Sequence, residues 1–327
     1  DELLDTWLES YAKPRIKTKT FEGYEYILRR YIRPRLGSRP LGKLSTAEIQ
    51  AVYNELLESG ISPRTIQYAN MILKQALKIS IVWRMTAFNP CDGVTVPRQQ
   101  RKEMKVLNPD QARRFLAFAR QDKHAALFEL AISTGPRPSE YCALKWSDVD
   151  LEKGLLSINR SIDWLPSGGW TITDNKTTGS RRSVKLPGNV VTALAAHKRR
   201  QDAERVAAHD EWQHLDFIFA NETGGPLDRH NIARRHFHPL LKAAGLERIR
   251  LYDLRHTAAT LALSAGIPIK VVSEMLGHTS TAMTMDVYSH VLPHMQDEAA
   301  KKMADILGDQ SAASETRLPG LHTKCTH

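Results

Sequence analysis

The chain is poor in the features that would assign it to several common protein classes. Its 327 residues include only three cysteines, Cys91, Cys142 and Cys325, which are too few and too scattered for a disulfide framework or a zinc site. No apolar run is long enough to span a membrane, and no signal peptide is visible. These absences favour a cytoplasmic protein with no membrane partner.

Histidine is missing from the first part of the chain. Residues 1–100 contain none, and all 13 histidines lie downstream. Chemistry that uses an imidazole is therefore expected in the second part. The sequence also lacks an Asp/Glu cluster with the spacing of a two-metal nuclease, so we expect no metal and no other cofactor.

Positive charge is in excess throughout. The formal net charge is +10 and the isoelectric point about 9.5. Residues 1–100 carry 15 Lys/Arg against 10 Asp/Glu, and the remainder carries 31 against 26. Both parts have the same excess, as expected if both contact one polyanion, although many basic proteins bind nothing acidic.

Helix-capping signals and a proline-marked linker predict two domains. Residues 1–90 are expected to form a small helical DNA-binding domain, because capping signals such as Ser45 open amphipathic stretches. The basic, proline-marked residues 91–106 predict a linker. Residues 107–307 form the second domain, and residues 308–327 a flexible tail.

A run of arginines follows the helix predicted at residues 18–33. Five arginines fall within eleven positions: Arg29, Arg30, Arg33, Arg35 and Arg39. We interpret the first four as contacts to a DNA backbone, although a solvated helix face would have the same composition.

The second domain mixes helical and strand patterns. Strand character appears at residues 155–162, 170–173 and 183–186, separated by glycine-containing turns, and predicts one small antiparallel sheet. The rest is helical, including a last amphipathic helix at 292–307. The predicted fold class is mainly α with a small antiparallel β-sheet.

Five residues of this domain stand in distinctive phrases. They are Arg137 in Thr-Gly-Pro-Arg-Pro-Ser-Glu, Lys176 in Lys-Thr-Thr-Gly-Ser-Arg, Arg255 in Asp-Leu-Arg-His-Thr, His278 in Leu-Gly-His and Tyr288 in Met-Asp-Val-Tyr-Ser-His. Three cations, an imidazole and a phenol best suit a phosphodiester that the phenol attacks.

The chemistry explains these residue types. Arg137 and Arg255 stay charged and bind phosphate oxygens bidentately, and Glu140, three residues after Arg137, can hold that guanidinium in place. Lys176 can give a proton to a leaving 5′ oxygen. Tyr288 is a weak nucleophile until nearby guanidiniums favour its phenolate. Each phrase alone also has an ordinary structural explanation.

In order and spacing, these phrases resemble the tyrosine recombinase (phage-type integrase) family, strongly over residues 107–307 and more weakly over residues 1–90. The resemblance implies a two-domain clamp around duplex DNA that breaks and rejoins specific sites through a 3′-phosphotyrosine, for integration or excision of a mobile element or prophage. It also implies a homo-tetramer on two recombination sites, with accessory DNA-bending proteins as further partners. His278 would hydrogen-bond the phosphate or orient Tyr288, and the helix at 292–307 resembles the segment that docks on a neighbouring protomer.

One position departs from the family. Its usual His-x-x-Arg reads Tyr252-Asp253-Leu254-Arg255 here, and tyrosine is a poor base at neutral pH. We expect Tyr252 to line the site as a hydrogen-bond donor and His256, on the same helix face, to have a packing role. The departure leaves the general base open and introduces a second phenol.

Two other functions remain open at this point. A type IB topoisomerase would relax supercoils as a monomer, and a DNA-binding regulator that has lost catalysis would bind sites without covalent attachment. Family members often carry a further N-terminal domain for arm-type sites, and a chain that begins at Asp1 is expected to have been trimmed.

Overall fold

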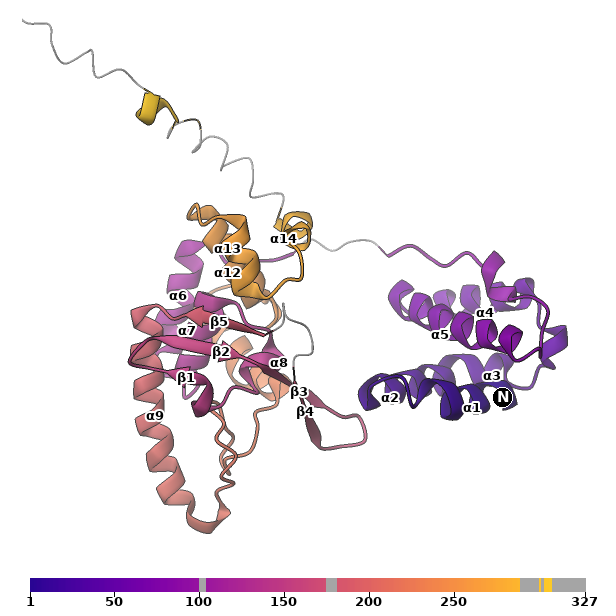
Figure 1. Cartoon of the computed structure of the whole chain (residues 1–327), viewed down its shortest axis with the longest axis horizontal. Helices are drawn as coiled ribbons and strands as arrows, with labels where there is room; N and C mark the ends of the chain where they lie inside the picture. The colour runs from indigo at the N-terminus through magenta and orange to yellow at the C-terminus, as the bar shows by residue number, and fades with distance from the viewer. Residues whose placement is uncertain (100–103, 175–180, 289–299, 301–302, 308–327) are drawn as a thin grey trace, which may run out of the picture.

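The computed structural model describes residues 1–99, 104–174, 181–288, 300 and 303–307. Two bodies are visible in Figure 1, an N-terminal domain of helices and a C-terminal domain of helices and short strands. Each has its own hydrophobic core. The structure is mostly helical with small antiparallel sheets, as the sequence predicts.

The N-terminal domain is built from short helical segments that continue into one another and two longer helices. Its elements are α1 (Glu2–Thr6), η1 (Trp7–Ala12), α2 (Thr18–Ile27), η2 (Leu28–Ile32), α3 (Arg33–Leu36), η3 (Leu41–Lys43), α4 (Thr46–Glu58), α5 (Pro63–Val82) and η4 (Pro90–Gly93). The predicted capping box at Ser45 is present, with Glu48 reaching back to it. The Ser62 hydroxyl accepts from Thr65 N and opens α5.

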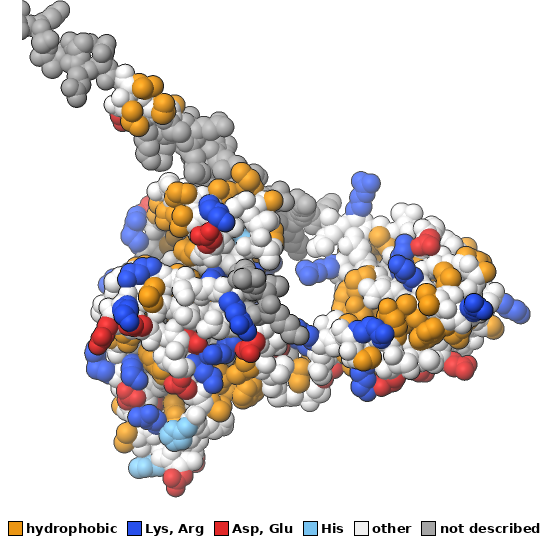
Figure 2. Space-filling view, in the orientation of Figure 1, with side chains coloured by type: hydrophobic (Ala, Val, Ile, Leu, Met, Phe, Trp, Pro, Cys, Tyr) orange, Lys and Arg blue, Asp and Glu red, His pale blue; other side chains and the backbone are white. Residues whose placement is uncertain are grey.

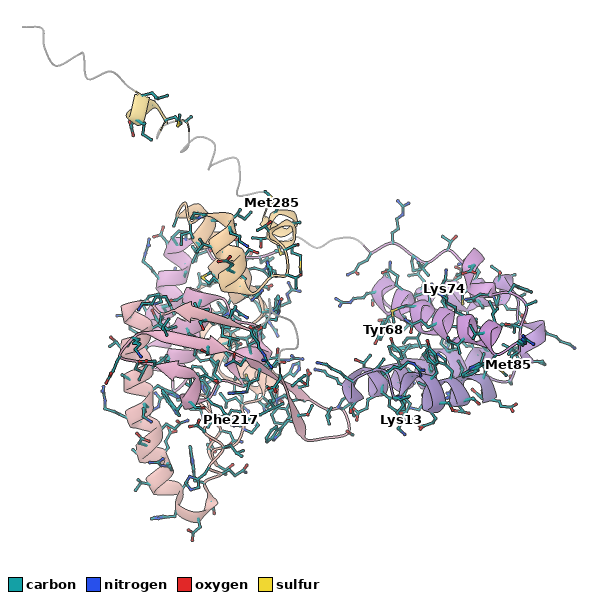
Figure 3. The ribbon with its side chains drawn as sticks, viewed as in Figure 1. Lys13, Tyr68, Lys74, Met85, Phe217 and Met285 are labelled. Atoms are coloured by element: carbon teal, nitrogen blue, oxygen red, sulfur yellow. The ribbon has the colours of Figure 1, made fainter. Side chains whose placement is uncertain are left out.

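The core of this domain lies between α5 and the first two helices. Trp7 stacks on Tyr24, whose ring packs edge-on against Tyr68 at 5.9 Å. Figure 3 shows Tyr68 among the packed helices of this domain. Cys91 is buried in the same core, and Val96 packs against it. The first core therefore extends a few residues beyond 90 into the segment predicted as a linker.

The C-terminal domain packs helices around one large core and also has a small second cluster of Ala259, Leu263, Val272 and Leu276. Its helices are α6 (Pro109–Ala119), α7 (Ala125–Thr134), α8 (Pro138–Tyr141), η5 (Trp146–Asp148), α9 (Gly188–Ala208), η6 (His209–Glu211), α10 (Arg229–Ile232), η7 (Ala233–Phe237), α11 (His238–Ala243), α12 (Asp253–Ser264), α13 (Ile269–Leu276) and α14 (Thr281–Tyr288). Phe115 lies with its ring centroid 5.4 Å from those of Phe128 and Phe237, which joins α6, α7 and η7.

The prediction of one sheet is wrong, because the strands form two. β1 (Val149–Asp150), β2 (Leu155–Ile158) and β5 (Arg182–Lys185) form a three-stranded sheet, whereas β3 (Arg160–Trp164) and β4 (Trp170–Asp174) form a separate two-stranded sheet. Leu156, Ile158 and Val184 are buried and hold the first sheet on the core. The β3–β4 hairpin carries few buried residues and extends away from that core (Figure 1).

The β3–β4 hairpin reaches the N-terminal domain. Lys19 Nζ of α2 lies 2.6 Å from Asp163 Oδ1, and Ser167 Oγ donates to Glu22 Oε1 at 2.6 Å. Figure 2 shows an opening between the two domains beside this contact, with Lys and Arg side chains at its edge. The domains are thus joined by the chain between them and meet again at the hairpin.

The predicted helix at 292–307 is described only in part. Residues 303–307 are helical, and residues 292–299 and 301–302 lie outside the described residues, as does the predicted tail at 308–327. Within the described ranges, no helix is both long enough and apolar enough to cross a membrane.

Candidate functional site

Gly135 marks the point at which three helices of the C-terminal domain meet. It ends α7 with a φ of 62°. A Cβ at this position would lie 2.7 Å from Leu276 Cδ2 of α13 and 3.2 Å from Ala258 Cβ of α12. Glycine is required both by the left-handed backbone and by this close approach. The Thr-Gly-Pro-Arg phrase therefore sets Arg137 beside α12 and α13.

Arg255 is buried at this junction. The residue is 2% exposed, and its Nη1 donates to Gly135 O at 2.8 Å. Its Nη2 is also buried and has no hydrogen-bond partner among the described residues. Burial lowers the pKa of Arg255 to about 10, and the nearby charge of Arg137 adds to this effect. The fold thus holds a cation where its charge is unfavourable.

Arg137 precedes α8 and is held by Glu140, as the sequence predicts. Arg137 Nη1 donates to Glu140 Oε1 and Arg137 N to Glu140 Oε2, both at 2.8 Å. The carboxylate is buried, which alone would raise its pKa, but Arg182 and Arg137 lower the pKa below its ordinary value. Glu140 is therefore ionised and fixes the Arg137 guanidinium, whose side chain remains 31% exposed.

Sequence reasoning missed Arg182, the second cation on Glu140. Its side chain is 6% exposed, and its Nη2 donates to Glu140 Oε2 at 2.8 Å. A signal existed in the sequence. Arg182 stands two residues before the buried Val184 on a strand, and residues two apart share a face of the strand. The alternation therefore indicated that the Arg182 side chain faces the interior.

His278 follows the left-handed Gly277 that ends α13. Its Nδ1 lies 2.7 Å from Thr284 Oγ1 of α14. Burial lowers the pKa of His278 to about 4, and the charges of Arg255, Arg137 and Arg182 contribute. The imidazole is therefore neutral at pH 7 and is oriented by a helix that also carries Tyr288.

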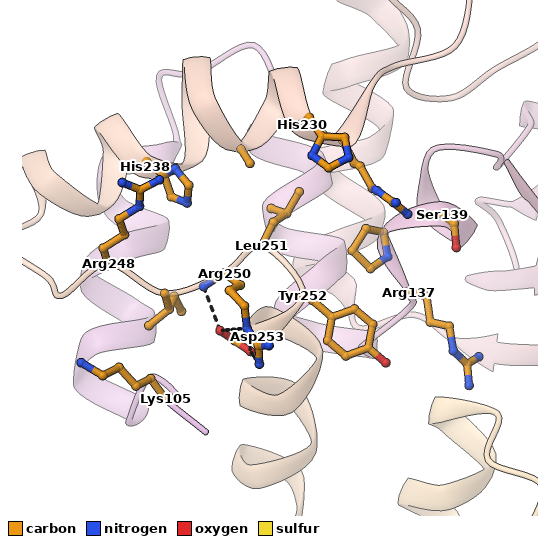
Figure 4. Close-up of a pocket in the computed structure, with 14 residues that line it drawn as sticks. Lys105, Arg137, Ser139, His230, His238, Arg248, Arg250, Leu251, Tyr252 and Asp253 are labelled. Atoms are coloured by element: carbon orange, nitrogen blue, oxygen red, sulfur yellow. Dashed lines mark hydrogen bonds and ion pairs between the residues drawn. The ribbon is translucent and has the colours of Figure 1, made fainter. Parts of the chain in front are cut away.

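A cavity of about 830 Å³ opens beside Arg137. Tyr252 is 40% exposed and lies with Arg137 at one end of it, whereas His238 and Arg248 lie at the other end (Figure 4). The Tyr252 ring packs edge-on against that of His256 at 5.3 Å. The lining also includes several basic residues that sequence reasoning did not single out: Lys105, Arg229, His230, Arg248 and Arg250.

Two of the predicted site residues are described little or not at all. Tyr288 is the last residue of α14, and its side chain lies outside what the structure describes. Lys176 lies outside the described residues, in the segment that connects β4 to β5. The two strands on either side of it, β4 and β5, belong to different sheets.

The predicted DNA-binding arginines of the N-terminal domain fall into two pairs. Arg29 and Arg30 are exposed. Arg33 Nη2 lies 2.6 Å from Asp5 Oδ1, and Arg35 Nη2 lies 2.9 Å from Glu55 Oε1. The second pair thus already has acidic partners within the domain. Contact of all four with DNA stays a prediction.

No cluster of three or more His, Cys, Asp or Glu side chains in the described part of the chain is arranged to hold a metal ion. The positive charge at the junction comes from guanidinium groups. These groups stabilise negative charge without a change in protonation, which suits an oxyanion or a phosphate.

Comparison with known proteins identifies similar sequences and folds. The model of the Phage integrase family matches residues 105–295, and that of the phage integrase N-terminal SAM-like domain matches residues 1–57. A "Tyrosine recombinase XerC-like" protein of Caldanaerobacter subterraneus subsp. tengcongensis is 29% identical, over 93% of this chain and 82% of its own length. The ICEBs1 integrase of Bacillus subtilis is 28% identical, over 89% and 79%.

A solved structure of similar fold is the Tn1549 transposon integrase in complex with a circular intermediate DNA. It superimposes with a TM-score of 0.76 at 22% identity, over 92% of this chain and 98% of its own. A lambda integrase dimer bound to a COC′ core site gives a TM-score of 0.64 at 22% identity, over 86% and 96%.

Proposed function

The chain belongs to the phage integrase family of tyrosine recombinases, and on that premise we propose which of its residues carry out site-specific strand exchange. Arg137 and Arg255 bind the nonbridging oxygens of the attacked phosphodiester, with Tyr252 and His278 as hydrogen-bonding partners. The single observation that carries this proposal is the buried Arg255, whose Nη2 has no partner among the described residues and which lies next to a second guanidinium. An anion at this place relieves both the cost of burying Arg255 and its repulsion from Arg137.

The reaction follows from these roles. The Tyr288 oxygen attacks phosphorus, the bond to the 5′ oxygen breaks, and the strand is left attached through a 3′-phosphotyrosine. The phenolic proton passes to a base, and Lys176 gives a proton to the departing 5′ oxygen. The new linkage conserves the energy of the broken one, so a 5′ hydroxyl of another strand reverses the step and completes the exchange.

Both domains take part in binding DNA in this proposal. Residues 1–90 act as the core-type domain and residues 107–307 as the catalytic domain, with 91–106 as linker and 308–327 as tail. The exposed Arg29 and Arg30 contact the backbone more readily than Arg33 and Arg35, which must first leave their acidic partners.

The assembly and its setting are also proposals. The lambda integrase has been seen as a tetramer bound to a Holliday junction. For this chain we infer a homo-tetramer on two duplex sites, with the helix at 292–307 docking on a neighbour. The exposed Met303, Ile306 and Leu307 give that segment an apolar surface. The setting is the cytoplasm of a bacterial or phage-infected cell, with DNA-bending proteins as accessory factors.

A covalent trap tests the chemistry. Duplexes that the protein selects from a random-sequence pool are rebuilt with a nick next to the attacked phosphate, so that the cut strand diffuses away and the adduct accumulates. We expect a denaturing gel to show a protein–DNA adduct that peptide mapping places on Tyr288 and that Tyr288→Phe abolishes. An adduct on Tyr252 overturns the assignment of the nucleophile, and no adduct on a bound site favours a silent regulator.

A plasmid assay separates recombination from relaxation. Supercoiled plasmids carrying two selected sites, one site or none are incubated with the protein. Recombinant circles are expected only from the two-site plasmid. Relaxation of all three at equal rates, with no recombinants, identifies a topoisomerase instead.

A further inference from the structure

Arg182 on β5 makes three hydrogen bonds across the C-terminal domain, although its guanidinium is almost completely buried. Nη1 and Nη2 donate to Glu140 Oε1 and Oε2 at 3.2 and 2.8 Å. Nε donates to Met275 O at 2.7 Å. These partners lie 42 and 93 positions away in the sequence. One side chain therefore fixes two elements that are distant in the chain.

The first partner connects Arg182 to Arg137. Both oxygens of Glu140 also accept from Arg137, one from the backbone N–H and one from Nη1. The bidentate contact from Arg182 holds the carboxylate in a single orientation, because each of its oxygens accepts one hydrogen bond from Arg182 and one from Arg137. The direction of the Arg137 guanidinium is set by that orientation.

The second partner connects Arg182 to His278. Met275 lies in the last turn of α13, where backbone carbonyls have no partner within the helix. The helix ends at Leu276, the left-handed Gly277 follows, and His278 comes next. A cation at the carbonyl end of a helix is favourable and holds that end in place.

We propose that Arg182 is a positioning residue of the recombination site, which aims Arg137 through Glu140 and fixes the turn that carries His278. The inference rests on the proposed function and adds to it a residue that need not touch DNA. A guanidinium is required, because an ammonium cannot donate along one plane to two carboxylate oxygens and a carbonyl.

The test is the single-turnover rate of adduct formation on the nicked duplex with protein in excess. We expect Arg182→Gln to slow this rate about 100-fold, as loss of an aligned phosphate-binding group does, while affinity for the selected duplex changes less than about threefold. Arg182→Lys keeps the charge and is expected to fold, yet to remain at least about tenfold slow. A wild-type rate in a folded Arg182→Lys protein overturns the inference.

A matched control separates positioning from stability. Arg160 Nη1 forms an ion pair of 2.6 Å with Asp148, which is also buried, in the same domain. We expect Arg160→Gln to lower the melting temperature as Arg182→Gln does but to keep the adduct rate within about threefold. An equal loss of rate in both variants assigns Arg182 a merely structural role.

A double-mutant cycle tests the route through Glu140. If Arg182 acts through this carboxylate, Glu140→Gln is expected to cost little further rate in the Arg182→Gln background. Additive losses, with the double variant slowed by the product of both factors, contradict that route. Wild-type protein must first form the Tyr288 adduct, so failure of the proposed function is seen separately.

The His278 ring gives a readout that needs no catalysis. The charged and titratable groups that influence it are Arg255 and His256 of α12, Arg137 before α8 and Arg182 of β5. Removing one positive charge stabilises the imidazolium, so NMR titration is expected to show a higher His278 pKa in Arg182→Gln and an unchanged one in the Arg160 control. No difference between the two variants counts against the link to His278.

Discussion

Among the described residues, the N-terminal domain buries two polar side chains, the uncharged Ser80 and Asn89, whereas the C-terminal domain buries four charged ones, Glu140, Asp148, Asp253 and Arg255. The ion pairs of the N-terminal domain lie at its surface, as Arg33 does with the half-exposed Asp1. Surface pairs contribute little to stability and are readily exchanged for other partners. Buried charges are expensive to keep, and two of them, Glu140 and Arg255, lie beside Arg137.

Exposed and buried arginines interact with a polyanion in two different ways. Exposed arginines supply long-range attraction and hold the duplex whatever its sequence. Guanidiniums withheld from water, such as Arg255, act strongly on a single phosphate because few water molecules screen them. If this account is right, substitutions in the two domains should affect different quantities.

The largest effect is expected at Arg255. Arg255→Gln should slow adduct formation about 100- to 1000-fold, because one of two phosphate-binding guanidiniums is lost. The free energy of unfolding should stay equal or rise, because a buried charge with an unpartnered Nη2 is removed. Urea denaturation and the trapping assay measure the two quantities. A loss of more than about 2 kcal/mol in stability would mean that Arg255 serves the fold.

The next largest effect concerns the backbone junction. Gly135→Ala should destabilise the protein by about 2–3 kcal/mol, because it strains a left-handed residue and sets a methyl group against Leu276. Gly60→Ala in the N-terminal domain is the matched control. Its φ of 82° is also left-handed, but nothing lies within 4 Å of the added carbon, so about 1 kcal/mol is expected. Equal losses at the two glycines contradict the close approach of α7, α12 and α13.

Acid should destabilise the two domains unequally. Burial lowers the pKa of His124 to about 3, from an ordinary value of 6.5. Below pH 6.5 the imidazole of His124 is protonated in the unfolded chain but not in the folded chain. The free energy of unfolding therefore falls as the pH drops from 6.5 towards the folded pKa, and His124 does not change it above pH 6.5. Between pH 7 and pH 5 the loss from His124 is about 1–2 kcal/mol.

Hydrogen exchange at the two pH values measures this loss domain by domain. Protection should fall in α7 and hold in α5, because residues 1–100 contain no histidine. His124→Asn should reduce the pH dependence in the C-terminal domain without abolishing it, because burial also lowers the pKa of His197, His256 and His278. A fall of equal size in both domains contradicts the assignment to histidine.

The smallest effect is expected at the surface pairs. Arg35→Gln, which removes the partner of Glu55, should change the free energy of unfolding by less than about 1 kcal/mol, and so should Lys19→Gln at the contact with the β3–β4 hairpin. Both changes should shrink further in high salt. Duplex affinity measured in 50 and 200 mM salt checks whether Arg29→Gln weakens binding more than Arg35→Gln does, because Arg29 has no ion pair with another described residue.

Local signals in the sequence predicted most of the helices. Ser45 opens a helix as expected, because a capping side chain acts over only a few residues. Local signals did not predict how the strands pair. The division of 155–185 into two sheets depends on which strands cover the core, a tertiary choice that alternation alone does not encode.

The contacts of the candidate site also include some that the sequence predicts and others that only the tertiary structure reveals. The spacing of Glu140 from Arg137 predicted their contact, and the contact forms because Arg137 stands just before α8 and Glu140, at the third position of the helix, reaches back to it. The contacts of Arg182 with Glu140 and Met275 join three segments, and no spacing in the sequence reports that. Tyr252 was expected to line the site, and it lies in the cavity beside Arg137, although its role stays a prediction.

The central claim is that the buried Arg255, together with Arg137, neutralises the negative charge of one phosphodiester. The most direct measurement replaces that phosphodiester in the nicked duplex with a neutral methylphosphonate and compares the adduct rates of wild type and Arg255→Gln. The account predicts a loss of about 100- to 1000-fold on the charged linkage and less than about tenfold on the neutral one. Equal losses on both linkages would show that Arg255 does not act on that charge.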